Sequence, residues 1–150
     1  MRLFIDTNVL LDIIMKRDGY SVACDLFRRI KSDKSTAFIS ASSATDLFYI
    51  IRKSTRSIGT AYEAMAYIFK LVSVLAVTES DVKTALVKRW DDYEDCVQYV
   101  VSVANGVDFI ITNNVSDFEA CPPHSITPID YLLSRTENPE SHKVPPKGDG

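Results

Sequence analysis

A short apolar run that ends abruptly in an acid, Leu3-Phe4-Ile5-Asp6, begins two residues into the chain and constrains the fold most. Such a run predicts a buried parallel strand that delivers a carboxylate to its C-terminal end. In an open α/β sheet, ligands bind in the crevice beyond the carboxyl ends of the strands. Asp6 is therefore the first candidate for chemistry or metal binding. The alternative is structural, in which Asp6 or Thr7 caps the helix that follows.

Further short apolar runs alternate with helical patterns along the chain. We expect strands near 36–39, 74–77, 108–112 and 125–127, and helices over 8–16, 20–31, 40–56, 60–71, 79–89, 96–104 and 131–134. Strands that alternate with helices predict right-handed crossovers between parallel strands. The predicted class is α/β, a three-layer α/β/α fold around a central parallel sheet of about five strands. We expect one domain over residues 1–136 and a disordered tail over 137–150, where Pro and Gly are frequent.

Composition excludes several classes of protein. The chain has 150 residues, of which 46% are hydrophobic and 25% charged, as in soluble globular domains. No apolar run approaches the roughly 20 residues that span a bilayer, and the N-terminus lacks the layout of a signal peptide. We therefore expect a cytoplasmic protein without a membrane segment. Three scattered cysteines and two histidines argue against a disulfide framework and a zinc site.

Charge is distributed unevenly although the net charge is only −3. Residues 1–60 carry ten Lys and Arg against six Asp and Glu, and residues 61–150 carry seven against fourteen. Basic residues of the first part would hold a phosphate backbone, and the candidates are Lys16, Arg17, Arg52 and Lys53. The alternative is that these side chains only solvate helix surfaces.

Acidic or amide side chains occur at four places where strand ends and helix starts would meet. They are Asp6, Asp46, the pair Asp92 and Asp95, and the pair Asn114 and Asp117. Each has a structural alternative. Asp46 would close a capping box that begins at Ser43, the second pair would favour a helix N-terminus, and the third would form a left-handed or capped turn.

Together these acids indicate a site for a hard divalent cation. Mg²⁺ and Mn²⁺ prefer carboxylate, carbonyl and water oxygens. Several carboxylates close together repel one another unless a cation neutralises them. Such a site suits phosphodiester hydrolysis, in which the ion activates water and stabilises charge on the attacking and leaving oxygens.

Four segments, in chain order, resemble successive motifs of the PIN domain family. They are Leu-Phe-Ile-Asp6-Thr-Asn8, Ser-Ala-Thr-Asp46-Leu, Asp92-Tyr-Glu-Asp95-Cys-Val-Gln98 and Ile-Ile-Thr112-Asn-Asn114-Val-Ser-Asp117-Phe118. The resemblance covers roughly residues 1–134 and implies a PIN-like fold. It also implies a Mg²⁺- or Mn²⁺-dependent endoribonuclease that cleaves single-stranded RNA. The commonest small bacterial members are VapC-like toxins, which pair with a protein antitoxin, and we expect a homodimer.

The resemblance implies a catalytic set and a slightly larger set of metal ligands. The catalytic residues are Asp6, Asp46, Asp95 and Asp117, and the metal ligands add Asp92 and Asn114. Asp46 stands where the family usually has the longer Glu, and Asn114 stands where many members have Asp. We count Asn8 and Thr112 with the substrate-binding residues and expect one of them to orient the acids by hydrogen bonds.

Two other functions compete with this hypothesis. A haloacid-dehalogenase-like phosphatase also begins with a strand that ends in a nucleophilic Asp, but its second Asp would fall at Asn8, and no Gly-rich motif with Lys follows. The other is a catalytically silent PIN-like module that binds RNA or a partner protein. The departures at Asp46 and Asn114 favour that alternative.

Overall fold

The protein was analysed as a computed structural model, which describes residues 1–118 and 121–136. Its elements are β1 (Arg2–Ile5), α1 (Thr7–Ile14), α2 (Tyr20–Ser32), β2 (Thr36–Ser40), α3 (Ala41–Thr55), α4 (Ile58–Leu71), β3 (Ser73–Leu75), α5 (Glu79–Lys88), α6 (Tyr93–Ala104), β4 (Phe109–Ile111), the 3₁₀ helix η1 (Val115–Asp117), β5 (His124–Ile126) and α7 (Pro128–Thr136). No helix in these two ranges is long and apolar enough to cross a membrane. The predicted tail, 137–150, lies outside the described residues.

The five strands form one parallel sheet in the order β3-β2-β1-β4-β5. The central strand is β1, in which Phe4 lies opposite Phe38 of β2 and Ile110 of β4. The chain builds β2 and β3 on one side of β1 and later adds β4 and β5 on the other. This change of direction is the topological switch point at which open α/β sheets bind ligands. Asp6, the residue after β1, stands at that point.

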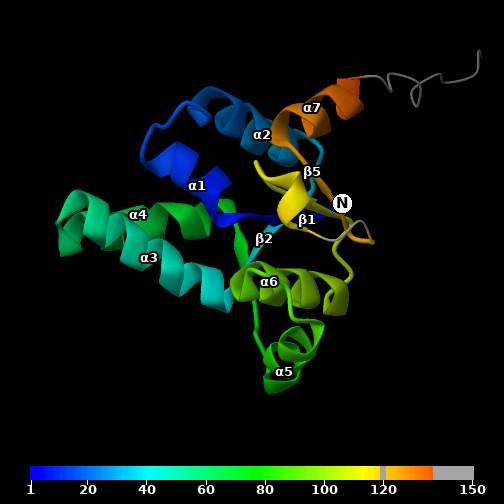
Figure 1. Cartoon of the computed structure of the whole chain (residues 1–150). Coiled ribbons are helices and arrows are strands. Elements are labelled where there is room, and N and C mark those ends of the chain that lie inside the picture. The colour runs from blue at the N-terminus through cyan, green and yellow to red at the C-terminus, as the bar shows by residue number, and fades with distance from the viewer. Residues whose placement is uncertain (119–120, 137–150) are drawn as a thin grey trace, which may run out of the picture.

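Helices cover both faces of the sheet, which confirms the predicted three layers (Figure 1). Because side chains alternate along a strand, Leu3 and Ile5 enter one core while Phe4 enters the other. The larger core contains buried side chains of α1, α2, α3 and α4, together with Tyr131 of α7. The smaller core packs Phe4 against side chains of α5 and α6. Both faces of β1 are therefore dry, as its unbroken apolar run predicts.

The helix that carries Asp46 begins where the sequence indicated, with Ser40 as its cap. Ser40, the last residue of β2, is the N-cap of α3, and its hydroxyl oxygen accepts a hydrogen bond from the Ser43 backbone N–H at 3.1 Å. The predicted capping box from Ser43 to Asp46 is therefore wrong, because Ser43 already lies inside the helix. Asp46 falls in the second turn of α3, where its carboxylate is free for contacts outside the helix.

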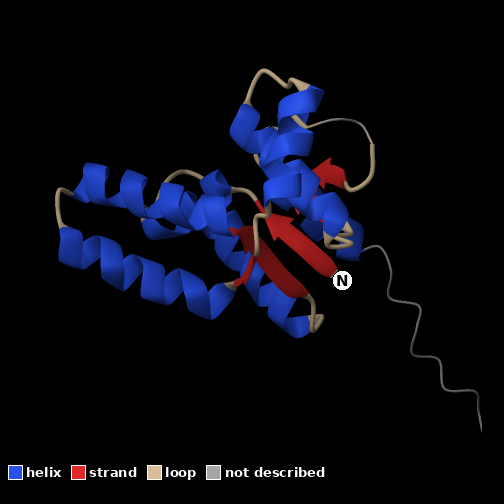
Figure 2. Cartoon of the chain, turned by 90° about the horizontal axis from the view of Figure 1, so that it is seen from below, coloured by secondary structure: helices blue, strands red, loops and turns tan. Residues whose placement is uncertain are grey.

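The helices α3 and α4 form a hairpin that extends away from the sheet in both views (Figures 1 and 2). The two helices pack against each other through buried Leu47 and Ile51 of α3 and Ala61 and Met65 of α4. Only the start of α3 is close to the carboxyl edge of the sheet. Residues in its last turn are carried away from that edge, by about 1.5 Å for each residue.

The hydrogen bond at the N-cap of α3 should contribute to the stability of the protein. Ser40 is fully buried, and its hydroxyl also lies 2.8 Å from that of Ser43. Ser40→Ala removes the cap and leaves a buried N–H without its partner. We expect the free energy of unfolding to fall by about 1–2 kcal/mol in urea denaturation.

Ser54→Ala is the matched control, because Ser54 is an exposed residue of the same helix. Its effect should stay within about 0.5 kcal/mol. Equal effects of the two substitutions would contradict the assignment of Ser40 as the cap.

Candidate active site

Asp6 is held rigidly at the end of β1. Its side chain is only 6% exposed, and its carboxylate Oδ2 accepts a hydrogen bond from the Thr112 hydroxyl at 2.8 Å. Burial raises the pKa of Asp6 above its usual range, while the hydrogen bonds from Thr112 and from the backbone N–H groups of Thr7 and Asn8 oppose that rise. The nearby charge of Asp117 raises the pKa of Asp6 further.

Thr112 follows β4 and is fully buried. Its hydroxyl donates to Asp6 and accepts the Asn114 backbone N–H at 3.0 Å. Thr112 therefore joins the ends of β1 and β4 and turns the next residues toward the site. From the sequence we expected the side chain of Thr112 or Asn8 to orient the acids by a hydrogen bond. Thr112 makes such a bond to Asp6 with its hydroxyl, whereas Asn8 contacts Asp6 only through its backbone N–H.

Asp95 lies in the first turn of α6 and faces three other acids. Desolvation raises the pKa of Asp95 to about 7, and the negative charges of Asp92, Asp6 and Asp117 raise it as well. Asp92 is also the N-cap of the helix, because its Oδ1 accepts the Asp95 backbone N–H at 3.1 Å. The structure thus brings together four predicted residues from β1, α6 and the turn after β4.

Asp46 meets a different acid, Glu94, which the sequence analysis did not single out. The pKa of Glu94 is raised to about 7 by desolvation, by a hydrogen bond shared with Asp46 and by the charges of Asp46, Asp92 and Asp95. Gln98, one turn later in α6, donates from Nε2 to Glu94 Oε1 at 3.3 Å. Glu94 therefore links the position of Asp46 to that of Asp95.

A signal for Glu94 was present in the sequence. It precedes Asp95 inside the acid-dense segment 91–95, and the shorter Asp46 leaves room for another carboxylate where the family usually has Glu. Gln98 is another residue that sequence reasoning missed. It is 1% exposed, and its Oε1 is a buried acceptor without a hydrogen-bond partner in the part of the chain that the structure describes.

The turn after β4 carries Asn114 and Asp117. Asn114 has a φ of −121° and is the N-cap residue of η1, so the left-handed turn considered from the sequence is wrong. Its backbone N–H donates to Thr112. Asp117 is the last residue of η1, and its backbone N–H donates to the Asn114 carbonyl at 3.1 Å. The turn thus presents Asp117 toward the acids of β1 and α6.

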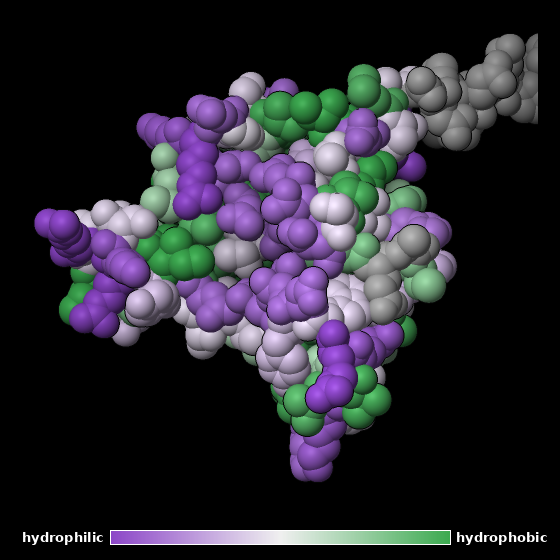
Figure 3. All heavy atoms as spheres, in the orientation of Figure 1, coloured by the Kyte–Doolittle hydropathy of each residue, from purple (hydrophilic) through white to green (hydrophobic). Residues whose placement is uncertain are grey.

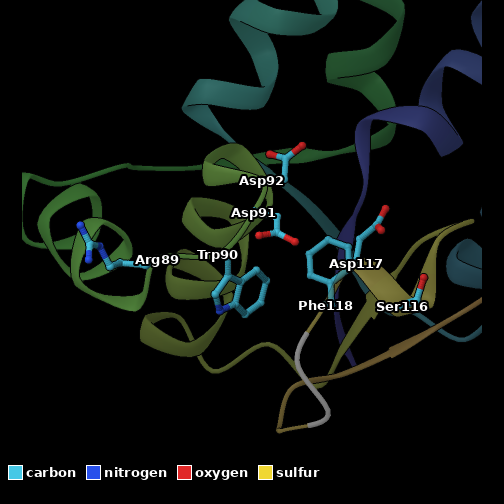
Figure 4. A pocket seen from close by; sticks show the side chains of 7 residues that line it. All are labelled: Arg89, Trp90, Asp91, Asp92, Ser116, Asp117 and Phe118. Atoms are coloured by element: carbon cyan, nitrogen blue, oxygen red, sulfur yellow. The ribbon is translucent and has the colours of Figure 1, made fainter.

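A cavity of about 430 Å³ opens beside these acids. It is lined by Arg89, Trp90, Asp91, Asp92, Ser116, Asp117 and Phe118, which come from the segment before α6 and from the turn after β4 (Figure 4). The Trp90 and Phe118 rings meet edge to face with their centroids 6.2 Å apart. In the orientation of Figure 1, hydrophilic side chains gather across the middle of this face, between α1 and α6 (Figure 3).

The predicted basic residues do not line this cavity. Lys16 and Arg17 lie in the loop between α1 and α2, while Arg52 and Lys53 lie in the last turn of α3, on the projecting hairpin. Arg89, at the end of α5, is the basic residue that does line it. The sequence analysis missed Arg89 because nothing in its local pattern distinguishes it from a solvated residue.

The donor chemistry of the site suits a hard divalent cation, since every candidate ligand offers oxygen. None of the ion pairs found within residues 1–118 and 121–136 neutralises Asp6, Asp46, Asp95 or Asp117. Across the same ranges, however, no three Asp, Glu, His or Cys side chains are arranged to hold one metal ion. Mutually repelling carboxylates favour separated positions.

Comparison with protein families settles the classification. The profile described as "PIN domain" matches residues 2–116, which is most of the chain. The chain belongs to the PIN domain family. The resemblance seen in the four motifs is thereby confirmed.

One relative of this PIN domain carries the name of a ribonuclease. The protein named ribonuclease VapC1, from Aquifex aeolicus (strain VF5), is 24% identical over 124 residues, which cover 77% of this chain and 83% of the relative. Its name describes that protein alone.

Solved structures show the same fold. VapBC2 from Rickettsia felis, bound to a DNA fragment from the promoter, is 17% identical with a TM-score of 0.64 and covers 85% of this chain and 98% of that one. A toxin-antitoxin complex from Klebsiella pneumoniae is 16% identical with a TM-score of 0.62 and covers 84% and 97%. VapC20 from Mycobacterium tuberculosis, a toxin that cleaves the sarcin-ricin loop, is 18% identical with a TM-score of 0.57 and covers 72% and 86%. At these identities the likeness establishes the fold.

The raised pKa values of Asp95 and Glu94, both about 7, predict how stability depends on pH. Between the unfolded pKa near 4 and about 7, the folded state holds protons that the unfolded chain has released. The contribution of these two groups to stability without metal is therefore fully present below about pH 4 and is lost as pH rises to about 7. We expect a lower melting temperature in EDTA at pH 7.5 than at pH 5.

The double variant Asp95→Asn/Glu94→Gln is the control, because its stability should depend less on pH over this range. A wild-type melting temperature that rises between pH 5 and 7.5 would contradict the mutual repulsion of these acids.

Proposed function

We propose that this PIN domain is a Mg²⁺- or Mn²⁺-dependent endoribonuclease that cleaves single-stranded RNA. The observation that supports it best is the meeting of Asp6, Asp92, Asp95 and Asp117 at the switch point of the sheet, where each acid faces the others' charges. The name of the Aquifex aeolicus relative, a ribonuclease, points to the same reaction. The haloacid-dehalogenase-like alternative falls with the family assignment.

Asp6 and Asp95 are the principal ligands in this proposal, with Asp46, Asp92, Asn114 and Asp117 as supporting ones. Glu94 joins the set because it shares a hydrogen bond with Asp46 and so adds the reach that the shorter Asp46 lacks. A bound divalent ion would supply an activated water and stabilise charge on the phosphate oxygens. The reaction then needs no covalent nucleophile from the protein.

The protein's own groups have three tasks. Thr112 holds the Asp6 carboxylate in one orientation through its 2.8 Å hydrogen bond. Asp95 and Glu94 must give up their protons before they can act as ligands, because a metal binds the ionised carboxylate. Arg89, which lines the cavity, would meet an RNA phosphate, while Lys16, Arg17, Arg52 and Lys53 would steer the strand.

We further propose that the protein is the toxin of a toxin-antitoxin pair, acts in the cytoplasm and forms a homodimer. The pairing with an antitoxin is supported by the likeness in fold to the Rickettsia felis VapBC2 assembly and to the toxin-antitoxin complex from Klebsiella pneumoniae. A reading frame for a small antitoxin-like protein beside this gene would support the pairing.

A catalytically silent module that binds RNA or a partner protein is the second candidate. It is favoured by the Asp at position 46, by the Asn at position 114 and by the separation of the acids within the described residues. Metal binding distinguishes the two candidates, because a silent module has no need for the ion.

The first test is thermal unfolding with millimolar Mn²⁺ or with EDTA. Mn²⁺ that binds the folded state alone raises the melting temperature. Glu94→Gln removes a charge that repels Asp46 and removes a ligand. We therefore expect this variant to melt above wild type in EDTA and to gain less from Mn²⁺.

Glu63→Gln is the matched control, since Glu63 is an exposed residue of α4. It should keep the full wild-type response to Mn²⁺. Wild-type scans that superimpose with and without Mn²⁺ would favour the silent module.

The second test measures cleavage of a mixed pool of single-stranded RNA. Asp6→Asn keeps the shape of the side chain but loses a charge and a bidentate ligand. Loss of a residue that merely supports a ligand costs about 10–100-fold, so loss of Asp6 itself should reduce the cleavage rate by more than about 100-fold. Excess EDTA should do the same.

Asp25→Asn serves as the control, because Asp25 is an exposed acid on α2 that pairs with Arg28. It should cleave at the wild-type rate. RNA binding should persist in Asp6→Asn and weaken steeply with salt, as phosphate contacts do. A preparation that cuts equally well with Asp6→Asn would show that its nuclease activity comes from another protein.

A further inference from the structure

A second cavity lies beside Asn113, the residue that follows Thr112. Its volume is about 580 Å³, and it is lined by Asp12, Arg17, Asp18, Gly19 and Asn113. A smaller cavity of about 290 Å³ shares Asp12, Asp18, Gly19 and Asn113 with it and adds apolar walls, among them Val22 and Pro128. The two therefore form one depression with a polar part and an apolar part.

Asp12 is an unusual residue for this place. It lies on α1, is only 8% exposed, and accepts a hydrogen bond from Asn113 Nδ2 at its Oδ2 at 2.9 Å. Among the ion pairs of the described chain, none includes Asp12. A carboxylate accepts about four hydrogen bonds, and a buried one is costly unless they are made. Asp12 has unused acceptor capacity at the wall of a cavity.

Gly19 packs closely against the Asp12 carboxylate. A Cβ added at Gly19 would lie 2.2 Å from Asp12 Oδ2 and 2.8 Å from its Cγ. The backbone of the loop after α1 therefore lies directly against the carboxylate, and a side chain at position 19 would displace Asp12. Asn113 holds the other side through its hydrogen bond. The Asp12 side chain is thus held between two segments, as a preorganised binding group would be.

Two consecutive residues of the chain, Thr112 and Asn113, connect the candidate active site with this cavity. Thr112 donates to Asp6, and the next residue, Asn113, donates to Asp12. A strand with a phosphate at Asp6 would therefore bring a neighbouring nucleotide to Asp12. Single-stranded RNA is recognised by splaying bases into such pockets and contacting their pairing edges.

We propose that the depression beside Asp12 and Asn113 holds one guanine base of the bound RNA strand. This inference rests on the proposed ribonuclease function and identifies which base its substrate must carry. Guanine presents two adjacent N–H donors beside a carbonyl on its pairing edge. The Asp12 carboxylate accepts from the two N–H groups, and the second N–H of the Asn113 amide donates to the carbonyl.

The surrounding residues suit a base more than a bare ion. Val22 and Pro128 offer apolar surface to the base plane, and Arg17 lies at the polar side, where the phosphate of the same nucleotide would emerge. Adenine and cytosine lack the adjacent pair of ring and amino N–H groups, and uracil carries a single N–H. A carboxylate that is left without its donors rejects such bases.

The first experiment sequences the ends produced from a random pool of single-stranded RNA in Mn²⁺. We expect guanine to be enriched at one fixed position relative to the cut, by roughly 10-fold, as a good bidentate contact to a base provides. Asp12→Asn keeps an acceptor for Asn113 but replaces one oxygen by a donor, so the enrichment should be lost. Asp25→Asn, the exposed acid on α2, should keep it.

The second experiment does not depend on cleavage. Thermal unfolding is measured in EDTA with a few millimolar guanosine 5′-monophosphate or adenosine 5′-monophosphate. We expect the guanine nucleotide alone to raise the melting temperature of wild type and of Asp25→Asn, and to have no effect on Asp12→Asn. Asn113→Ser serves if Asp12→Asn does not fold, and should lose the response as well.

The outcomes separate this inference from the proposed function. RNA that is cut without guanine enrichment, or no response to guanosine monophosphate, overturns the guanine site and leaves the ribonuclease intact. A guanine response in a protein that cuts no RNA supports the site and contradicts the ribonuclease. A lower melting temperature of Asp12→Asn with unchanged guanine enrichment shows that the bond between Asp12 and Asn113 is structural only.

Discussion

The hydrogen bond from the Thr112 hydroxyl to the Asp6 carboxylate is the interaction on which the candidate site depends. It joins the end of the central strand β1 to the end of β4 in a place with almost no access to water. Because Thr112 also accepts the Asn114 backbone N–H, it sets the path of the turn that carries Asp117. Asn113, the residue between them, reaches Asp12 in the opposite direction.

Repulsion between like charges is the second constraint. Asp95 and Glu94 have pKa values near 7 because they are partly desolvated and face further acids. Such an arrangement weakens the folded state near neutral pH, and acids with raised pKa values cluster at functional sites. In our proposal, a divalent cation removes that cost and uses the same carboxylates as ligands. Stability and activity would then depend on one ion.

The difference from the family pattern at Asp46 has a physical explanation in the folded chain. Asp46 is shorter than the Glu usual at its position, yet the structure places Glu94 of the neighbouring helix against it. A carboxylate therefore remains on α3, and Glu94 adds a second one from α6.

The sequence by itself determined the class of the fold, the approximate bounds of its elements and most of the acids, because periodicity and strand-end acids are local properties of the chain. Asp6 and Asp95 could be named from their positions alone. The pairing of Glu94 with Asp46 and that of Asp12 with Asn113 could not be predicted, because each joins residues that are distant in the chain. The sequence indicated neither that Arg52 and Lys53 would be carried away on the α3–α4 hairpin nor that Arg89 would line the cavity. Only the tertiary structure decides these points, because contacts between distant segments follow from how the helices pack on the sheet.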